Sequence, residues 1–160
     1  MVQPMKPRFA TLEPWGYTTL RIAYAAIILT HGIPKALRIP HGSIADPLMA
    51  TTGLIQRTLG LPFSFELAVL VTLLETAGAL LLAAGVFTRI VAVAFVGEML
   101  GICLAMGPAW PWTDRGIEYP VLLAVLAAYF ALRGPGLHSV RGLLRQHGIP
   151  TDGLGREPPL

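Results

Sequence analysis

The chain has 160 residues, of which 54% are hydrophobic and 13% are charged, with a net charge of +3 and a mean hydropathy of +0.62. Soluble domains carry about 25% charged residues, so this composition excludes an ordinary soluble enzyme and indicates an integral membrane protein. The basic residues gather on no single face. We therefore expect the positive net charge to serve contact with a lipid bilayer, and we expect no nucleic acid as a partner.

Four apolar runs follow one another along the chain, over residues 17–37, 65–84, 89–106 and 117–132. Each approaches the roughly 20 residues that a helix needs to cross about 30 Å of hydrocarbon. None shows the alternation of a barrel strand, and a helix satisfies its own backbone groups in lipid. The runs predict an all-α fold, an integral membrane four-helix bundle forming one domain over 1–140, followed by a basic, Pro/Gly-rich cytoplasmic tail over 141–160.

Two shorter helices are predicted outside these runs. Asp46 is suited to cap a helix and Pro47 to its first position. One face of this helix would carry Leu48, Thr52, Ile55 and Leu59. We expect it to be a short interfacial helix in the outer loop between the first two spans. In the tail, Ser139 would cap a short basic helix whose inward residues are Val140, Leu143 and Leu144.

The distribution of basic residues predicts the orientation. With the N-terminus in the cytoplasm, eight Lys and Arg residues lie on the cytoplasmic side and four outside, and cytoplasmic loops normally carry the excess. Trp15 and Tyr17 mark one interface, and Trp110 and Trp112 mark the other. We expect a multi-pass protein of the inner (plasma) membrane with both termini in the cytoplasm.

Two carboxylates are predicted near the middle of the bilayer. Glu75 lies ten residues before Gly85 and Glu98 nine after Arg89, so at about 1.5 Å per residue both are roughly 14 Å deep. A charge at this depth costs several kcal/mol unless it is paired, protonated or faces water. The cation expected to reach Glu75 is Arg21. The two would form either a buried pair that fixes helix register or part of a site for a proton or a quinone-like ligand.

Glu98 has two interpretations. If it faces inward, two carboxylates and one guanidinium cannot all carry charge comfortably, so one Glu would hold a proton near neutral pH and suit proton transfer. Otherwise a protonated Glu98 would donate a hydrogen bond to the backbone of a neighbouring helix.

A second polar group is predicted at the outer end of the bundle. At about 100° per residue, one stripe of the first helix carries Arg21, Tyr24, Ile28, His31 and Lys35. The same arithmetic places on one face of the fourth helix Glu118, Leu122, Val125 and Tyr129. Lys35 and Glu118 would either form an interfacial ion pair beside a solvated His31, or join His31 in an outer pole that exchanges protons.

The sequence indicates no intrinsic redox centre. Cys103 is the only cysteine, which excludes a thiol relay by this chain alone. A di-iron bundle needs Glu-x-x-His pairs, but Gly78 and Gly101 stand where those histidines would be. His31 is the only histidine within a predicted span, which excludes a haem held by two histidines. We expect no metal site.

Four segments occur in order between Leu20 and Val140: "LRIAYAAIILTHGIPKAL", "ETAGALLLAAGVFTR", "GIEYPVLLAVLA" and "RGPGLHSV". In this order and spacing they resemble the DoxX family of small bacterial and archaeal membrane proteins. The resemblance implies a four-helix fold with both termini inside and a role as membrane subunit of oxidoreductase systems. Members are associated with thiosulfate:quinone oxidoreductase and with complexes containing sulfurtransferase or superoxide dismutase. The charged motif of the family falls on Arg21, His31, Lys35, Glu75, Arg89 and Glu118.

Residues and resemblance together predict a membrane subunit that supports electron or proton transfer to quinone beside a redox partner. The catalytic set would be Arg21, Glu75 and Glu98. The ligand-binding set would be His31, Lys35, Glu118, Tyr24 and Tyr129. Quinone is the candidate cofactor, with none intrinsic to the chain, and the expected partner is a redox protein or a second copy in a homo-oligomer.

Two other functions stay open on the sequence. The two midplane carboxylates would also suit a proton-coupled small-molecule carrier or permeation protein. Alternatively, the buried charges only set helix register, and the chain is a membrane anchor or assembly factor without its own activity. If the chain does take part in catalysis, it would be as a quinone-linked oxidoreductase subunit without a metal or thiol centre.

Overall fold

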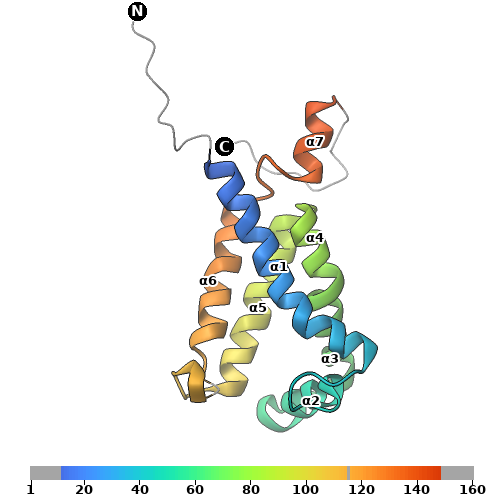
Figure 1. The fold of residues 1–160 in the computed structure, drawn as a ribbon. Coiled ribbons are helices and arrows are strands. Elements are labelled where there is room, and N and C mark those ends of the chain that lie inside the picture. The colour runs from blue at the N-terminus through green and yellow to red at the C-terminus, as the bar shows by residue number, and fades with distance from the viewer. Residues whose placement is uncertain (1–11, 115, 149–160) are drawn as a thin grey trace, which may run out of the picture.

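The computed structural model describes residues 12–114 and 116–148, and within them the fold is all-helical (Figure 1). An isolated β-bridge joins His41 to Ile44. The helices are α1 (Glu13–Leu37), α2 (Pro47–Leu54), the π-helical turn η2 (Ile55–Leu59), α3 (Ser64–Leu73), the π-helical turn η3 (Leu74–Gly78), α4 (Ala79–Ala84), α5 (Thr88–Met106), the 3₁₀ turn η4 (Trp112–Asp114), α6 (Glu118–Arg133) and α7 (Val140–Gln146). The end of the predicted tail, 149–160, lies outside the described residues.

Four long helical segments lie side by side (Figure 1). They are α1, the continuous stretch α3–η3–α4, α5 and α6, and they fall on the four predicted ranges. α7 and the start of α1 lie at one end of the molecule, and α2 lies at the other (Figure 1). That all four cross a bilayer as a bundle stays a prediction.

Two of these segments are long and apolar enough to cross a membrane: Ser64–Ala84, with 21 residues, and Thr88–Met106, with 19. α1 has 25 residues but includes Arg21 and Lys35, and α6 has 16. Large apolar side chains are exposed along the segments, among them Leu70, Leu80, Ile90, Val93, Leu104 and Leu132. So many exposed large apolar side chains on two segments long enough to cross a membrane suit contact with lipid.

The core between the segments combines small and aromatic side chains. Alanines from all four segments are buried: Ala25, Ala79, Ala92 and Ala127. Small residues let helix backbones approach closely, which is how helices associate in lipid. Tyr24 fills the centre and packs edge-on against Phe95 and Phe130, with ring centroids 5.6 and 5.4 Å away.

Both predicted helix caps are confirmed. The Asp46 side chain accepts a hydrogen bond from the backbone N–H of Met49, and Pro47 occupies the first position of α2. Ser139 accepts a hydrogen bond from the backbone N–H of Gly142 at the start of α7. These bonds satisfy N–H groups that a helix leaves without internal partners. That α2 lies on the membrane surface stays a prediction.

Two predicted faces do not line the interior. The face of α6 with Glu118, Leu122, Val125 and Tyr129 is exposed, whereas the buried residues are Pro120, Leu123, Ala127 and Phe130. The face with Ala127 allows the closer approach to α5, against which α6 packs along its length. In α7, of the three residues predicted to face inward, Val140 and Leu143 are exposed and Leu144 is half-buried, whereas Arg141 is buried.

Candidate functional site

Lys35 and Glu75 form a buried ion pair between α1 and η3. The Nζ atom of Lys35 donates to Oε1 of Glu75 at 2.6 Å. The side chains are only 13% and 5% exposed, respectively. A buried pair of this kind is strongly destabilised when one partner is removed, because the other is left as an uncompensated charge. The predicted pair between Glu75 and Arg21 is therefore wrong, and Lys35 is the partner.

A close crossing of two backbones creates this pair. A Cβ atom added to Gly32 would lie 2.6 Å from both the carbonyl carbon and the carbonyl oxygen of Glu75. Only glycine therefore fits where α1 meets η3. Lys35 follows Gly32 by three residues, which is close to one helical turn and places both on the same face of α1. Gly32 brings the helices together, and Lys35 then reaches the carboxylate.

Glu75 itself stands in a π-helical turn, η3. Such turns inside an α-helix are often found at functional sites. The hydroxyl groups of Thr72 and Thr76 donate to the carbonyls of Ala68 and Thr72, four residues earlier, at 2.8 and 2.7 Å. This back-bonding often bends helices. The local sequence "TLLET" thus supplies both the irregular turn and its carboxylate.

Glu98 of α5 faces this ion pair. Its carboxyl group interacts electrostatically with Glu75 and Lys35, as the predicted equal depth of the two carboxylates requires, and their depth in a bilayer stays a prediction. Both carboxyl oxygens of Glu98 and Oε2 of Glu75 are buried without a partner as long as both groups are ionised, and a proton on one of them would join the two carboxyl groups by a hydrogen bond. Buried polar atoms normally have partners, and exceptions point to water, an ion or a catalytic role.

Tyr24, on α1 like Lys35 but eleven residues earlier, is linked to this group through Glu98. Its hydroxyl is buried without a hydrogen-bond partner and interacts electrostatically with Glu98. We call Tyr24, Lys35, Glu75 and Glu98 the carboxyl cluster. It contains two carboxyl groups, one ammonium group and one phenol within the helical core. These groups can hold a proton, pass it on and donate hydrogen bonds to a small ligand.

Arg21 lies at the other end of α1, where it binds carbonyl groups. It precedes Lys35 by 14 residues, about 21 Å along the helix. Its guanidinium donates to the carbonyls of Ala83, at 3.2 Å, and His138, at 2.9 Å, and also to that of Pro135. Arg21 therefore does not join the carboxyl cluster, because its length cannot bridge the distance along α1.

The surroundings of Arg21 indicate a structural role. Ala83 is in the last turn of α4, where carbonyl groups lack helical partners and the helix dipole favours a cation. Gly85 follows with a φ of +72°, and a Cβ there would lie 2.4 Å from that of Ser139. The Tyr17 ring also contacts the guanidinium, 5.8 Å from its centroid. Arg21 thus ties α1, the end of α4 and the segment after α6 together.

The remaining predicted site residues do not gather. His31 is exposed and packs edge-on against His41, with 5.1 Å between ring centroids. Glu118 is exposed at the start of α6, and Lys35 pairs with Glu75 in its place. Tyr129 is 43% exposed and contacts Tyr17 near Arg21. Of the two predicted sets, Lys35, Glu75 and Glu98 come together and Tyr24 is linked to them through Glu98, whereas the roles of all four stay predictions.

Sequence reasoning missed the pairing of Lys35 with Glu75. The missed signal is Gly32, whose position one turn before Lys35 marks a close helix crossing. Among the residues that the structure describes, no group of three or more His, Cys, Asp and Glu side chains could hold a metal ion.

Comparison with known proteins identifies a family. The model of the DoxX family matches residues 16–108, which include Arg21 and all four residues of the carboxyl cluster. No curated protein matches the chain. No solved structure matches it either.

Proposed function

Because this chain belongs to the DoxX family and is a membrane protein, we propose that it is the membrane subunit of an oxidoreductase system. It would support electron or proton transfer to quinone beside a partner that carries the redox centre. The observation that carries the proposal is the carboxyl cluster, in which two buried carboxyl groups lie close enough to share a proton beside Lys35.

The charges of the carboxyl cluster favour proton exchange. Two carboxylates and one ammonium leave a net negative charge in a medium where charge is costly. One proton shared by Glu75 and Glu98 makes the cluster neutral while Lys35 stays charged. Removing or adding that proton changes the charge of the core. If a ligand nearby changes its charge, the cluster would therefore gain or lose this proton in response.

The donor set fits a quinone. A quinone presents carbonyl oxygens, and the Tyr24 hydroxyl and a protonated Glu98 can donate hydrogen bonds to such acceptors. When bound, the quinone would supply the electron acceptor. Reduction of a quinone to a quinol consumes protons as well as electrons, and the carboxyl cluster would hold the protons.

In the proposed topology the chain crosses the inner membrane four times and both termini are in the cytoplasm. α1 and α6, with 25 and 16 residues, would span about 37 and 24 Å at 1.5 Å per residue. Arg89, Arg133 and Arg141 lie near the end that carries α7, which supports that end as cytoplasmic. α2 would then lie on the outer surface.

The test is purification of the full chain in mild detergent, with identification of copurifying proteins and titration with a quinone analogue. We expect a redox protein among the partners and quinone binding that Glu98→Gln weakens. Glu66→Gln, at an exposed position in the first turn of α3, is the matched control and should leave binding unchanged. Absence of both quinone binding and a redox partner would overturn the proposal.

A proton-coupled carrier is the second candidate, favoured by the same two carboxyl groups. Four helices enclose a narrow space, so transport would require a homo-oligomer. Proton flux in liposomes that depends on Glu75 and Glu98 would favour this candidate. A monomer without flux would exclude it. If neither function depends on the cluster and the chain still recruits its partner, it is an anchor or assembly factor.

A further inference from the structure

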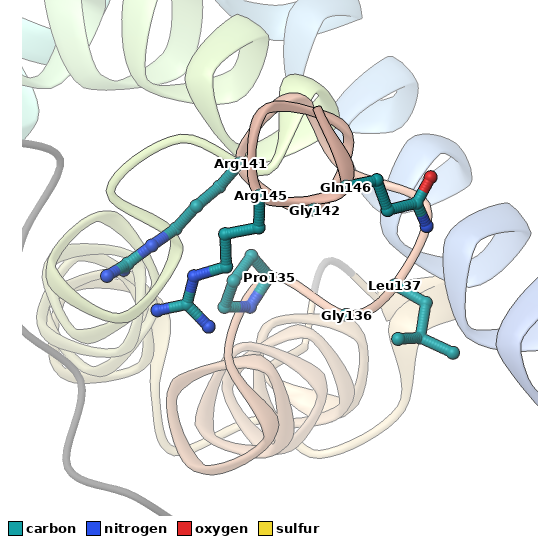
Figure 2. A pocket seen from close by; sticks show the side chains of 7 residues that line it. All are labelled: Pro135, Gly136, Leu137, Arg141, Gly142, Arg145 and Gln146. Atoms are coloured by element: carbon teal, nitrogen blue, oxygen red, sulfur yellow. The ribbon is translucent and has the colours of Figure 1, made fainter. Parts of the chain in front are cut away.

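A pocket of about 310 Å³ lies between α7 and the segment that follows α6. Residues 135–137 form one wall, and α7 forms the other with Arg141, Gly142, Arg145 and Gln146. Figure 2 shows the side chains of Arg141 and Arg145 extending from the same side of α7, beside Pro135. The pocket is at the opposite end of α1 from the Lys35–Glu75 ion pair.

The wall opposite α7 is held in place by the body of the molecule. Arg21 donates hydrogen bonds to the carbonyls of Pro135 and His138. Gly136 has a φ of +73°, and a Cβ there would lie 2.8 Å from the ring of Tyr17. Positive φ and close approach both favour glycine. The pocket therefore has a preformed wall, and a ligand would not have to order it.

The chemistry of the lining favours an anion. Among its described residues, the charged side chains are the two arginines, and no Asp or Glu lines the pocket. The Gln146 amide can donate as well. Guanidinium groups present planar forks of N–H donors that match phosphate oxygens. A volume near 300 Å³ is at the lower end of ligand pockets and suits a phosphate-bearing headgroup.

Apolar side chains beside the pocket point to the source of the phosphate. Leu137, Val140 and Leu143 are 64%, 43% and 53% exposed. Trp15 lies at the same end and is 61% exposed, with its ring centroid 4.1 Å from that of His138. Exposed Leu and Trp beside Arg are typical of segments that lie in a membrane interface. We propose that this pocket binds the phosphate of an anionic phospholipid, whose acyl chains contact the apolar residues of 137–143.

The test uses the full chain in detergent after removal of lipid. Short-chain phosphatidylglycerol and phosphatidylcholine of equal acyl length are titrated, and binding is measured by calorimetry. We expect tighter binding of phosphatidylglycerol, weakened about fivefold by Arg145→Gln, since a basic residue near anionic lipid contributes about 1 kcal/mol. Arg57→Gln removes the same charge from an exposed position on η2, at the far end, and should leave binding unchanged.

Further variants separate the outcomes. Arg145→Lys keeps the charge on an exposed residue and should bind more tightly than Arg145→Gln. Inorganic phosphate should bind far more weakly than phosphatidylglycerol, because it has no acyl chain. Three results would each overturn the proposal. They are equal binding of the two lipids, a loss of phosphatidylglycerol binding in Arg57→Gln equal to that in Arg145→Gln, and inorganic phosphate that binds as tightly as phosphatidylglycerol.

Discussion

The ammonium group of Lys35 lies 2.6 Å from Oε1 of Glu75, which joins the end of α1 to the π-helical turn η3 in the middle of the neighbouring segment. Gly32 allows the backbones to approach at this point, and Glu98 of α5 faces the pair. Three of the four long segments therefore meet at a single charged contact.

The ion pair should show strong coupling between its two members. Lys35→Met alone should lower the free energy of unfolding by about 3–5 kcal/mol, since it leaves Glu75 buried without its partner. The double variant Lys35→Met/Glu75→Leu should recover most of this loss. Unfolding in mixed detergent micelles is measured for the wild type, for Lys35→Met and Glu75→Leu alone, and for the double variant, and strictly additive effects would show that the side chains do not interact.

The crossing at Gly32 should tolerate no side chain. Gly32→Ala places a methyl group against the backbone of Glu75, so we expect a loss of about 1–3 kcal/mol, typical of overpacking. Gly97→Ala is the control, because a Cβ at Gly97 of α5 meets nothing within 4 Å. It should leave stability unchanged or raise it slightly. Equal thermal stability of the two variants in detergent would contradict the close crossing.

Arg21 should have a structural role that depends on the several N–H donors of its guanidinium group. Arg21→Lys keeps the charge, but a compact ammonium cannot serve the carbonyls of Ala83, Pro135 and His138 together. We expect a loss of about 2 kcal/mol or more, with faster proteolysis within 134–139. Arg133→Lys, at a surface pair with Glu13, should cost less than about 1 kcal/mol. Unchanged proteolysis in Arg21→Lys would argue against the clamp.

A shared proton in the carboxyl cluster should be visible by infrared spectroscopy. The protonated carboxyl group of the Glu75 and Glu98 pair should give a carbonyl band that shifts in heavy water. Glu98→Gln should remove this band, because Glu75 can then stay ionised beside Lys35. Glu66→Gln serves as the control and should leave the band in place. A wild-type spectrum without the band would show that both carboxyl groups are ionised.

The sequence by itself determined the local features of this protein. Run length and composition predicted the ranges of the long helices, because crossing hydrocarbon demands about 20 apolar residues. Asp46 and Ser139 predicted two helix starts, since capping depends on residues close together in the chain. The approach of Glu98 to Glu75 also followed from sequence, because a tight turn at Gly85 makes their helices antiparallel neighbours.

Only the tertiary structure decided which charges meet. Sequence periodicity placed Arg21 and Lys35 on one stripe of α1 but could not choose between them, because the choice depends on how two helices cross. Gly32 sets that crossing through a backbone contact with Glu75, and Arg21 turns instead to carbonyl groups of α4 and the segment after α6. Local pattern fixes where a side chain lies on its own helix, whereas its partner depends on packing between segments far apart in the chain.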